Sequence, residues 1–226
     1  QEPRRVDSDA VSLGAGVATN LMLMKFQCHF LSVPVAILGC VGLICTSAYA
    51  MDTGILDLAV TQEETTLQAR VGVAVIDTDS GLTWQHRGDE RFPLNSTHKA
   101  FSCAAVLAQA DRHKLNLEQA IPIERTALVT YSPVTERVPP GGTLTLRELC
   151  RAAVSISDNT AANLALDAIG GARTFTAFMR SIGDDKTRLD RREPELNEAT
   201  PGDARDTTTP IAAARSLQTL LLDGVL

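Results

Sequence analysis

The sequence is poor in aromatic and basic residues, and each shortage excludes a class of protein. Aromatic residues make up only 4% of the 226 residues, too few for the stacking platforms that bind single-stranded nucleic acid. Lysine and arginine number 21 against 27 aspartates and glutamates, and this net charge of -6 argues against a nucleic-acid partner, which needs a basic surface. The four histidines lack the spacing of metal ligands, so we expect no metal or other cofactor.

The rest of the composition is that of an ordinary folded protein, with 44% hydrophobic and 21% charged residues. One long uncharged run, from Phe26 to Ala50, stands apart. It follows Lys25 and ends in Ala48-Tyr49-Ala50, which is the pattern of a secretory signal peptide. We therefore expect residues 22–50 to be a signal peptide, cleaved after Ala50, and the mature protein to be periplasmic, with no membrane contact.

Two other interpretations of this run stay open. An uncleaved transmembrane anchor is one, because the run approaches the length that spans a bilayer. Lipidation at Cys40, which follows Ile37-Leu38-Gly39, is the other. Residues 1–21 are polar and fit none of these patterns. We expect them to be a non-native segment translated from upstream of a true start at Met22 or Met24.

The cysteines divide between the signal region and the mature chain. Cys28, Cys40 and Cys45 lie in the signal region, which leaves Cys103 and Cys150. An exported protein with two cysteines is a candidate for one disulfide bond, because its compartment is oxidising. The alternative is a pair of free thiols, since cysteine is also a good small core residue.

The pattern of apolar residues after residue 51 indicates a helix, a hairpin and then a series of helices. Residues 52–68 predict the first helix, and β-rich segments at 70–76 and 82–86 predict a hairpin around the turn at 77–81. The later helices are predicted at residues 97–112, 144–156, 160–169, 173–182 and 210–222. A two-stranded hairpin buries little core by itself, so we expect an antiparallel sheet that is incomplete in this chain.

The first candidate catalytic motif is Ser96-Thr97-His98-Lys99. At the start of a helix, residues three apart share one face, so the Ser96 hydroxyl and the Lys99 amine lie close together. Serine is a weak nucleophile until a base removes its proton, and a lysine can act as that base. A helix-capping serine beside a surface lysine is the structural alternative.

The second motif, Ser157-Asp158-Asn159, falls between two predicted helices. In extended backbone, residues two apart point the same way, so Ser157 and Asn159 are expected to face one cleft while Asp158 turns inward. Residues of these types also form ordinary helix caps.

The third motif is Glu193-Pro194-Glu195-Leu196-Asn197, in a polar segment. Glu193 and Asn197 are spaced to hold a water between them, which Glu193 could activate as a general base. Arg191 and Asp206 bracket 16 residues and could close them as an ion pair, which predicts a compact Ω-loop. The structural alternative is an acidic surface loop.

Taken in this order, the three motifs resemble those of the class A serine β-lactamases. Other segments from residue 51 onward share the resemblance, namely Phe92-Pro93-Leu94, Leu128–Pro133, Thr160–Asn163, Leu189-Asp190-Arg191 and Arg205–Pro210. Within the class, the chain looks most like the carbenicillin-hydrolysing and similar penicillinases. The resemblance implies a two-lobe β-lactamase/transpeptidase-like fold, α/β plus all-α. Residues 51–92 would then start the α/β lobe, 93–210 form the all-α lobe and 211–226 begin the return.

The resemblance also implies hydrolysis of the β-lactam ring of penicillin-type antibiotics by a monomeric enzyme. Ser96 would be acylated with the help of Lys99, and Ser157 would pass a proton to the lactam nitrogen. Glu193 and Asn197 would direct a water onto the acyl-enzyme. The substrate would lie against Tyr131 and Asn159. A disulfide between Cys103 and Cys150 matches a pair found in many members.

Three features depart from the family pattern. His98 stands where many relatives carry an aromatic residue, and Arg192 where an aromatic residue is common beside the loop glutamate. The third departure is that no Lys-Thr-Gly or Arg-Ser/Thr-Gly triplet occurs in the sequence, so we expect a C-terminally incomplete chain. In the family, that triplet recognises the substrate carboxylate and supplies an oxyanion N–H, whose loss costs about 100- to 1,000-fold in rate. Two further interpretations therefore stay open: an inactive β-lactamase fragment and a penicillin-binding DD-peptidase.

Overall fold

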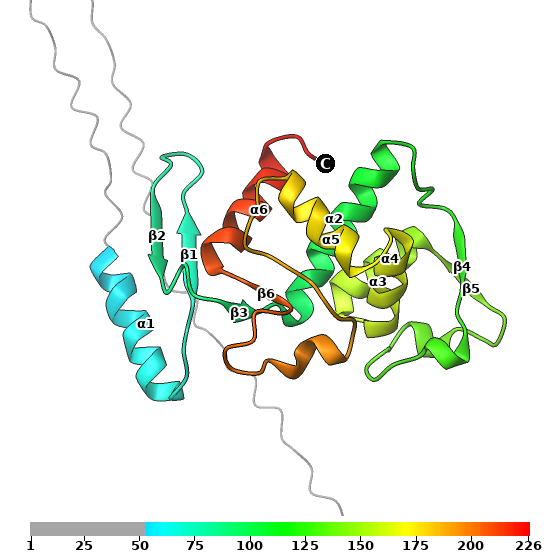
Figure 1. Ribbon diagram of the computed structural model, residues 1–226, viewed down its shortest axis with the longest axis horizontal. Helices are drawn as coiled ribbons and strands as arrows, with labels where there is room; N and C mark the ends of the chain where they lie inside the picture. Colours follow the sequence, from blue (N-terminus) through cyan, green and yellow to red (C-terminus); the bar gives the residue numbers. More distant parts are fainter. Residues whose placement is uncertain (1–52) are drawn as a thin grey trace, which may run out of the picture. The chain divides into compact units, whose positions relative to one another are not determined.

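The computed structural model describes residues 53–226 (Figure 1). The expected signal peptide, the segment before it and Cys28, Cys40 and Cys45 lie outside these residues. Six α-helices occur in the described part, namely α1 (Thr53–Leu67), α2 (His98–Asp111), α3 (Leu146–Ile156), α4 (Asn159–Ala168), α5 (Ala172–Ser181) and α6 (Pro210–Leu222). The strands there are β1 (Val73–Ile76), β2 (Thr83–His86), β3 (Phe92–Pro93), β4 (Ala120–Pro122), β5 (Thr143–Thr145) and β6 (Thr207–Thr208). Short 3₁₀ turns are η1 (Asn95–Thr97), η2 (Arg125–Ala127), η3 (Thr135–Arg137) and η4 (Glu195–Glu198). None of the helices in residues 53–226 is long and apolar enough to cross a membrane.

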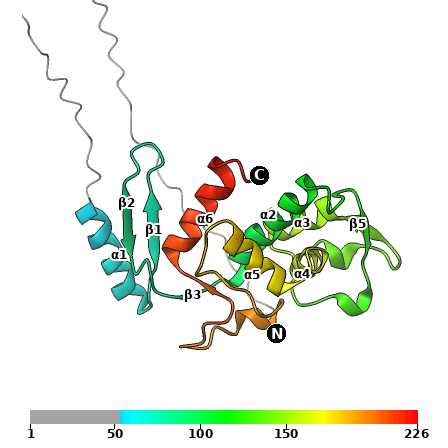
Figure 2. The ribbon, with the colours of Figure 1, turned by 45° about the horizontal axis from the view of Figure 1, so that its top comes forward.

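The α/β part consists of α1, the β1–β2 hairpin and α6. The hairpin is antiparallel, as the two β-rich segments and the turn between them predicted, and it pairs Val73 with His86. At its turn, the Gly81 N–H donates to the Asp77 carbonyl at 2.8 Å, and Gly81 takes a positive φ of 74° that glycine adopts without strain. Helix α1 contacts β2 and α6 contacts β1 (Figures 1 and 2). Within residues 53–226 this sheet has two strands, and α1 has no buried residue.

The helical part is built around α2, which contacts α3, α4 and α5. The four helices enclose two clusters of buried apolar side chains, whose members include Phe101, Leu146, Leu149, Leu166, Phe175 and Met179. Side chains cap three of the helices in the described residues, α3, α4 and α6. Thr145 and Glu148 form a reciprocal capping box on α3, and Thr209 caps α6 directly before Pro210. The mixed fold, α/β with an all-α part, agrees with the expected class.

Two short strand pairs were not predicted. Strand β4 pairs with β5 beside the helices, and β3 pairs with β6 (Figure 1). The second pair matters for the site, because it joins the residues just before Ser96 to the end of the polar segment that carries Glu193. The Leu94 N–H extends this connection by donating to the Asp206 carbonyl at 2.8 Å.

Candidate active site

Ser96 lies in the 3₁₀ turn η1, which runs directly into α2. The preceding Asn95 has a positive φ of 44°, so the chain turns sharply before the helix begins. Ser96 is exposed, whereas Lys99, one turn later on the same face, is only 2% exposed. The Nζ of Lys99 lies 3.0 Å from the Ser96 Oγ. The structure thus brings together the hydroxyl and the amine, with the hydroxyl facing solvent.

Lys99 connects the three sequence motifs. Besides Ser96, its Nζ contacts the Ser157 Oγ at 2.8 Å, the Asn159 Oδ1 at 2.6 Å and the Glu193 Oε1 at 3.0 Å. The Ser157 carbonyl lies at 2.9 Å. An ammonium group has three hydrogens for these five oxygens. Lys99 can therefore exchange its hydrogen bonds among the neighbouring groups without moving its nitrogen.

The Ser157-Asp158-Asn159 triplet reaches Lys99 through a backbone that differs from our prediction. We expected extended backbone, but Ser157 ends α3 in the left-handed conformation, with φ 62° and ψ 32°. Asp158 alone is extended, and Asn159 begins α4. The left-handed residue turns the chain between the two helices, so Ser157 and Asn159 still face Lys99. The Ser157 Oγ donates to the Ser96 Oγ at 2.8 Å.

Asp158 turns inward, as predicted, and is fully buried. Its carboxylate accepts the N–H groups of Val134, Thr135 and Ala161 at 2.8–3.0 Å. The Ala161 contact caps α4, so the helix-capping interpretation of this motif also holds. Asp158 therefore fixes the loop before α3 against the start of α4, on which Asn159 lies.

Asn159 and Tyr131 lie at the exposed side of this cluster. The Asn159 side chain bridges Lys99 and the Thr130 carbonyl, to which its Nδ2 donates at 2.8 Å. Its backbone N–H donates to the Tyr131 carbonyl at 3.0 Å. Tyr131 itself is 62% exposed and has a positive φ of 62°, so its ring is free to meet a bound molecule.

Glu193 is the acidic group of the cluster. Its Oε1 contacts Lys99 and also the His98 Nε2 at 3.2 Å, and its Oε2 accepts the Asn197 Nδ2 at 2.5 Å. Burial alone would raise the pKa of Glu193, but the hydrogen bonds from His98, Lys99 and Asn197 together lower it to about 2. Glu193 is therefore a carboxylate at neutral pH and can accept a proton.

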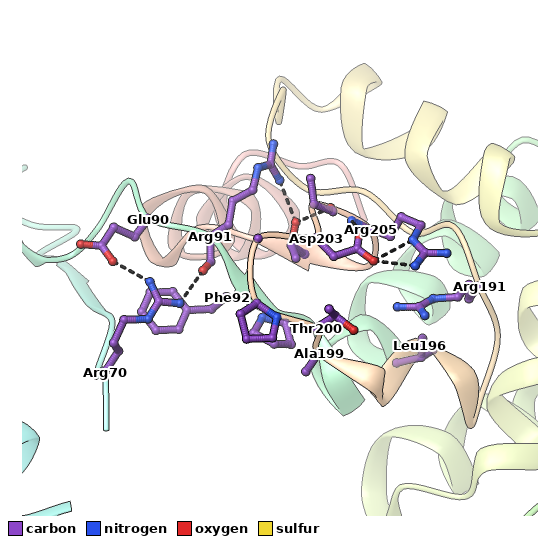
Figure 3. A pocket seen from close by; sticks show the side chains of 15 residues that line it. Arg70, Glu90, Arg91, Phe92, Arg191, Leu196, Ala199, Thr200, Asp203 and Arg205 are labelled. Atoms are coloured by element: carbon purple, nitrogen blue, oxygen red, sulfur yellow. Dashed lines mark hydrogen bonds and ion pairs between the residues drawn. The ribbon is translucent and has the colours of Figure 1, made fainter. Parts of the chain in front are cut away.

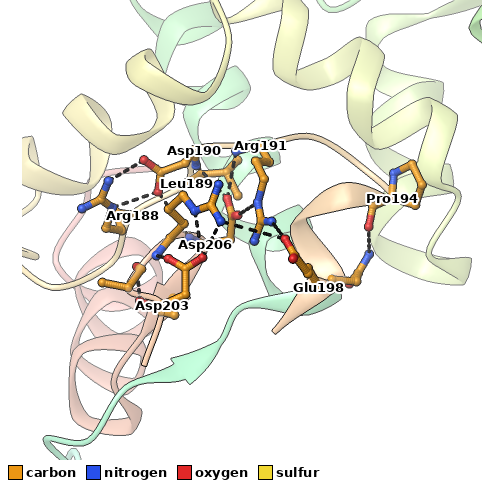
Figure 4. Close-up of polar contacts among 12 residues, drawn as sticks. Arg188, Leu189, Asp190, Arg191, Pro194, Glu198, Asp203 and Asp206 are labelled. Atoms are coloured by element: carbon orange, nitrogen blue, oxygen red, sulfur yellow. Dashed lines mark hydrogen bonds and ion pairs between the residues drawn. The ribbon is translucent and has the colours of Figure 1, made fainter. Parts of the chain in front are cut away.

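The segment that carries Glu193 is held at both ends. The Nε of Arg191 lies 2.5 Å from the Asp206 Oδ2, which closes residues 191–206 as the sequence suggested (Figure 4). Asp206 also accepts the N–H groups of Asp190 and Arg191, and Arg191 further contacts Glu198. Inside the loop the Glu193-Pro194 peptide is cis. Buried Leu196 packs in the helical core and fixes the turn that carries Asn197.

Two buried residues, Asn163 and His98, also hold Glu193 in place, and neither was among the predicted site residues. Asn163, on α4, accepts the Glu193 N–H at 3.0 Å and donates to the Glu193 carbonyl at 2.9 Å. His98 was noted only as a departure from the family pattern, yet it is fully buried against Glu193. A polar residue on the inner face of each helix was the available signal, because a buried polar side chain needs a partner.

The chain was then compared with known proteins. The model of the beta-lactamase enzyme family matches residues 56–226. The chain belongs to this family. Beta-lactamase AER-1 of Aeromonas hydrophila is 59% identical over 181 residues, which is 80% of this chain and 60% of that protein. Beta-lactamase CARB-3 of Pseudomonas aeruginosa is 49% identical over 163 residues, covering 72% of this chain and 56% of its own length.

Solved structures of class A beta-lactamases give the same result for the fold. An ancestral class A beta-lactamase matches with a TM-score of 0.74 and 55% identity, over 76% of this chain and 65% of that chain. The chromosome-encoded beta-lactamase of Vibrio parahaemolyticus matches with a TM-score of 0.73 and 47% identity over the same shares. The resemblance to class A β-lactamases is thus confirmed. This chain spans about 60% of the length of the curated relatives that it matches.

The cysteine pair of this family member requires a correction. Cys103 and Cys150 are free thiols in the structure, and the expected disulfide is not formed. Cys103 is buried in α2, and its Sγ instead contacts the Cys150 carbonyl at 3.8 Å. The hydrogen bond with the Cys150 thiol, together with burial, raises the pKa of Cys103. The two thiols therefore pack against each other as small core groups, the alternative that the sequence left open.

A larger hollow of about 660 Å³ lies outside the catalytic cluster, between the start of β3 and the end of the Ω-loop (Figure 3). Four arginines are among its lining residues, and each already has a partner; that of Arg191 is Asp206. Arg70 pairs with Glu90, Arg205 pairs with Asp203, and Arg91 donates to Thr207. Among the described residues, no group of three or more His, Cys, Asp or Glu side chains could hold a metal ion.

Proposed function

We propose that this site hydrolyses the β-lactam ring of penicillin-type antibiotics through a serine acyl-enzyme. One observation carries the proposal: the Lys99 Nζ lies within 3.0 Å of the Ser96 Oγ, the Ser157 Oγ and the Glu193 Oε1. One nitrogen, the Lys99 Nζ, therefore contacts the proposed nucleophile, proton donor and general base. This is the arrangement that a two-step acyl transfer requires.

In the acylation step, the Ser96 oxygen bonds to the lactam carbonyl carbon and the carbon–nitrogen bond of the ring breaks. The serine proton passes to Lys99 as the ammonium releases one of its own protons to the ionised Glu193, 3.0 Å away. Ser157 gives its own proton to the departing nitrogen and is reprotonated from Lys99, 2.8 Å away. Lys99 then recovers a proton from Glu193, which becomes a carboxylate again. Charge that develops on the carbonyl oxygen meets the Ser96 N–H, at the N-terminal turn of α2.

In the hydrolysis step, a water held between Glu193 and Asn197 attacks the ester carbonyl. Glu193 takes one proton of this water, and the bond between the carbonyl carbon and the Ser96 oxygen breaks. The Ser96 oxygen regains a proton from Lys99, which recovers it from Glu193. The hydrogen bond between Asn197 and Glu193, 2.5 Å long, supports this division of roles, because it fixes one carboxylate oxygen toward the side of the loop where Asn197 is exposed. Pairing of a general base with a positioned amide is what separates a hydrolase from a slowly deacylating DD-peptidase.

The names of the relatives support the substrate class, since AER-1 and CARB-3 are both called beta-lactamases. The side chains of Tyr131 and Asn159 would contact the substrate. We further propose that the enzyme is periplasmic and monomeric and that it confers antibiotic resistance.

The test follows hydrolysis of a chromogenic β-lactam and, in the same samples, the intact mass after mixing with penicillin. The parent chain is compared with Ser96→Ala and with Ser155→Ala, a matched change at an exposed helical serine. Turnover and a penicilloyl adduct that disappear only in Ser96→Ala would support the proposal. A chain that is folded by circular dichroism but gives neither adduct nor turnover would overturn it.

A further inference from the structure

We propose that His98 is a positioning residue for Glu193. Its Nε2–H holds Oε1 of the carboxylate and thereby leaves Oε2 as the oxygen that takes the proton from the hydrolytic water. This inference rests on the function proposed above and assigns a role to a buried residue that the proposed reaction does not use.

The contacts of His98 place it at the centre of a short relay. The ring is fully buried, with its Nε2 3.2 Å from the Glu193 Oε1 and its Nδ1 3.3 Å from the Ser102 Oγ, one turn further along α2. A buried imidazole needs a partner at each nitrogen, and His98 has one at both.

The chemistry of the partners assigns the hydrogens. An ionised carboxylate only accepts hydrogen bonds, so Nε2 must carry the hydrogen that points at Glu193. In a neutral ring Nδ1 is then an acceptor, and the Ser102 hydroxyl supplies its hydrogen. The relay therefore runs from Ser102 through His98 to Glu193. The carboxylate fixes the tautomer, and the serine hydroxyl adapts to it as a donor.

The relay fills the acceptor sites of one Glu193 carboxylate oxygen and leaves one site open on the other. Each oxygen of a carboxylate accepts about two hydrogen bonds. Oε1 receives His98 and Lys99, so both of its sites are filled. Oε2 receives only Asn197 among the described residues, which leaves one site for a water. An aromatic residue in place of His98 would leave a second open site, on the oxygen that faces away from Asn197.

The surroundings contain few other groups that titrate. Glu193 in the Ω-loop contacts His98 directly, and Lys99 on α2 contacts the same carboxylate oxygen. Helix α4 contributes only the uncharged Asn163 to the Glu193 backbone. The Arg192–Asp167 pair lies nearby on the exposed side of the loop. A substitution of His98 therefore changes the hydrogen bonding of Glu193 while the charged residues around Glu193 stay the same.

The kinetic test separates acylation from hydrolysis in His98→Phe, which preserves size but removes the donor. We expect acylation to change little while hydrolysis of the acyl-enzyme slows about tenfold, so that the adduct accumulates. Loss of a donor to the ionised form raises the pKa of Glu193, so the acid limb of the hydrolysis rate should move up by about one pH unit. His98→Gln keeps an N–H donor and should restore both properties in part. His113→Asn, at the exposed end of α2, is the matched control.

A spectroscopic test does not depend on turnover. Nitrogen-15 NMR of the imidazole in the parent should show a protonated Nε2 and an unprotonated Nδ1. Glu193→Gln, whose amide can donate as well as accept, should weaken this preference. Unchanged partition and pH profile in a folded His98→Phe, or a ring protonated at Nδ1, would overturn the proposal. If the parent forms no acyl-enzyme, the proposed function fails, and the tautomer alone then decides whether His98 holds Glu193.

Discussion

The ammonium of Lys99 and the carboxylate of Glu193 lie 3.0 Å apart, with side chains only 2% and 1% exposed. A buried ion pair is costly unless hydrogen bonds satisfy the remaining sites of both groups. Here Ser96, Ser157 and Asn159 do so for the lysine, and His98 and Asn197 for the glutamate. The groups that stabilise the pair are also the groups of the proposed reaction, so stability and activity should respond together.

The first prediction concerns pH. The pKa of Glu193 falls from an ordinary 4.5 to about 2 on folding, so the unfolded chain binds more protons between these values. The stabilisation from Glu193 is therefore present above about pH 4.5 and is lost as the pH falls toward 2. Urea unfolding at a series of pH values should show a shallower loss in Glu193→Gln than in the parent. Equal slopes for both proteins would contradict this assignment.

The second prediction concerns Asn163, which bonds both backbone groups of Glu193. Asn163→Ala leaves a buried N–H and a buried carbonyl without partners, so the free energy of unfolding should fall by about 3 kcal/mol. Acyl-enzyme should also accumulate, because Glu193 loses its position. Asn116→Ala, at an exposed turn, removes one local hydrogen bond and should cost less than about 1 kcal/mol. A similar loss in both variants would argue against a special role for Asn163.

The third prediction compares two arginine–carboxylate pairs of the Ω-loop, Arg191 with Asp206 (Figure 4) and Arg205 with Asp203 (Figure 3). Asp206 is 1% exposed and accepts Arg191 together with two backbone N–H groups, so Asp206→Ala should cost about 3 kcal/mol and expose residues 191–206 to proteases. Arg205 is 49% exposed, and Arg205→Ala should cost less than about 1 kcal/mol. Limited proteolysis with mass mapping of the cut sites distinguishes the two.

The fourth prediction concerns Cys103. The thiolate is the reactive form, and the Cys150 thiol and burial both raise the pKa of Cys103. Iodoacetamide should therefore leave Cys103 unmodified in the native protein and label it after denaturation, as read by peptide mass spectrometry. Fast labelling of the native protein would contradict the buried, protonated thiol. An intact mass lacking two hydrogens would show instead that the disulfide forms.

Local signals made much of this fold predictable from the sequence. Pro210, at the position where a helix tolerates proline best, predicted the start of α6. The apolar spacing of residues 97–112 predicted α2 to within one residue at each end. The pairs β3–β6 and β4–β5 were missed, because two- and three-residue strands show no periodicity and pair with partners far away in the sequence.

The sequence predicted the motifs of the candidate site and their order, but it did not predict how the residues are arranged in space. The left-handed conformation of Ser157 has no local signature, since a serine rarely adopts it. The bonds of Asn163 and His98 to Glu193 join residues 30 and 95 positions apart, and only the packed structure brings such residues together. The free thiols likewise depend on packing that the cysteine count cannot reveal.

Asp206 links the two halves of the site in a way that neither half shows alone. Its side chain closes the loop that carries Glu193, and its carbonyl receives the N–H of Leu94, two residues before Ser96. Asp206 thus positions both the Ser96 oxygen and the Glu193 carboxylate. If the backbone at Asp206 moves, Ser96 and Glu193 move with it, and the distance between them is preserved.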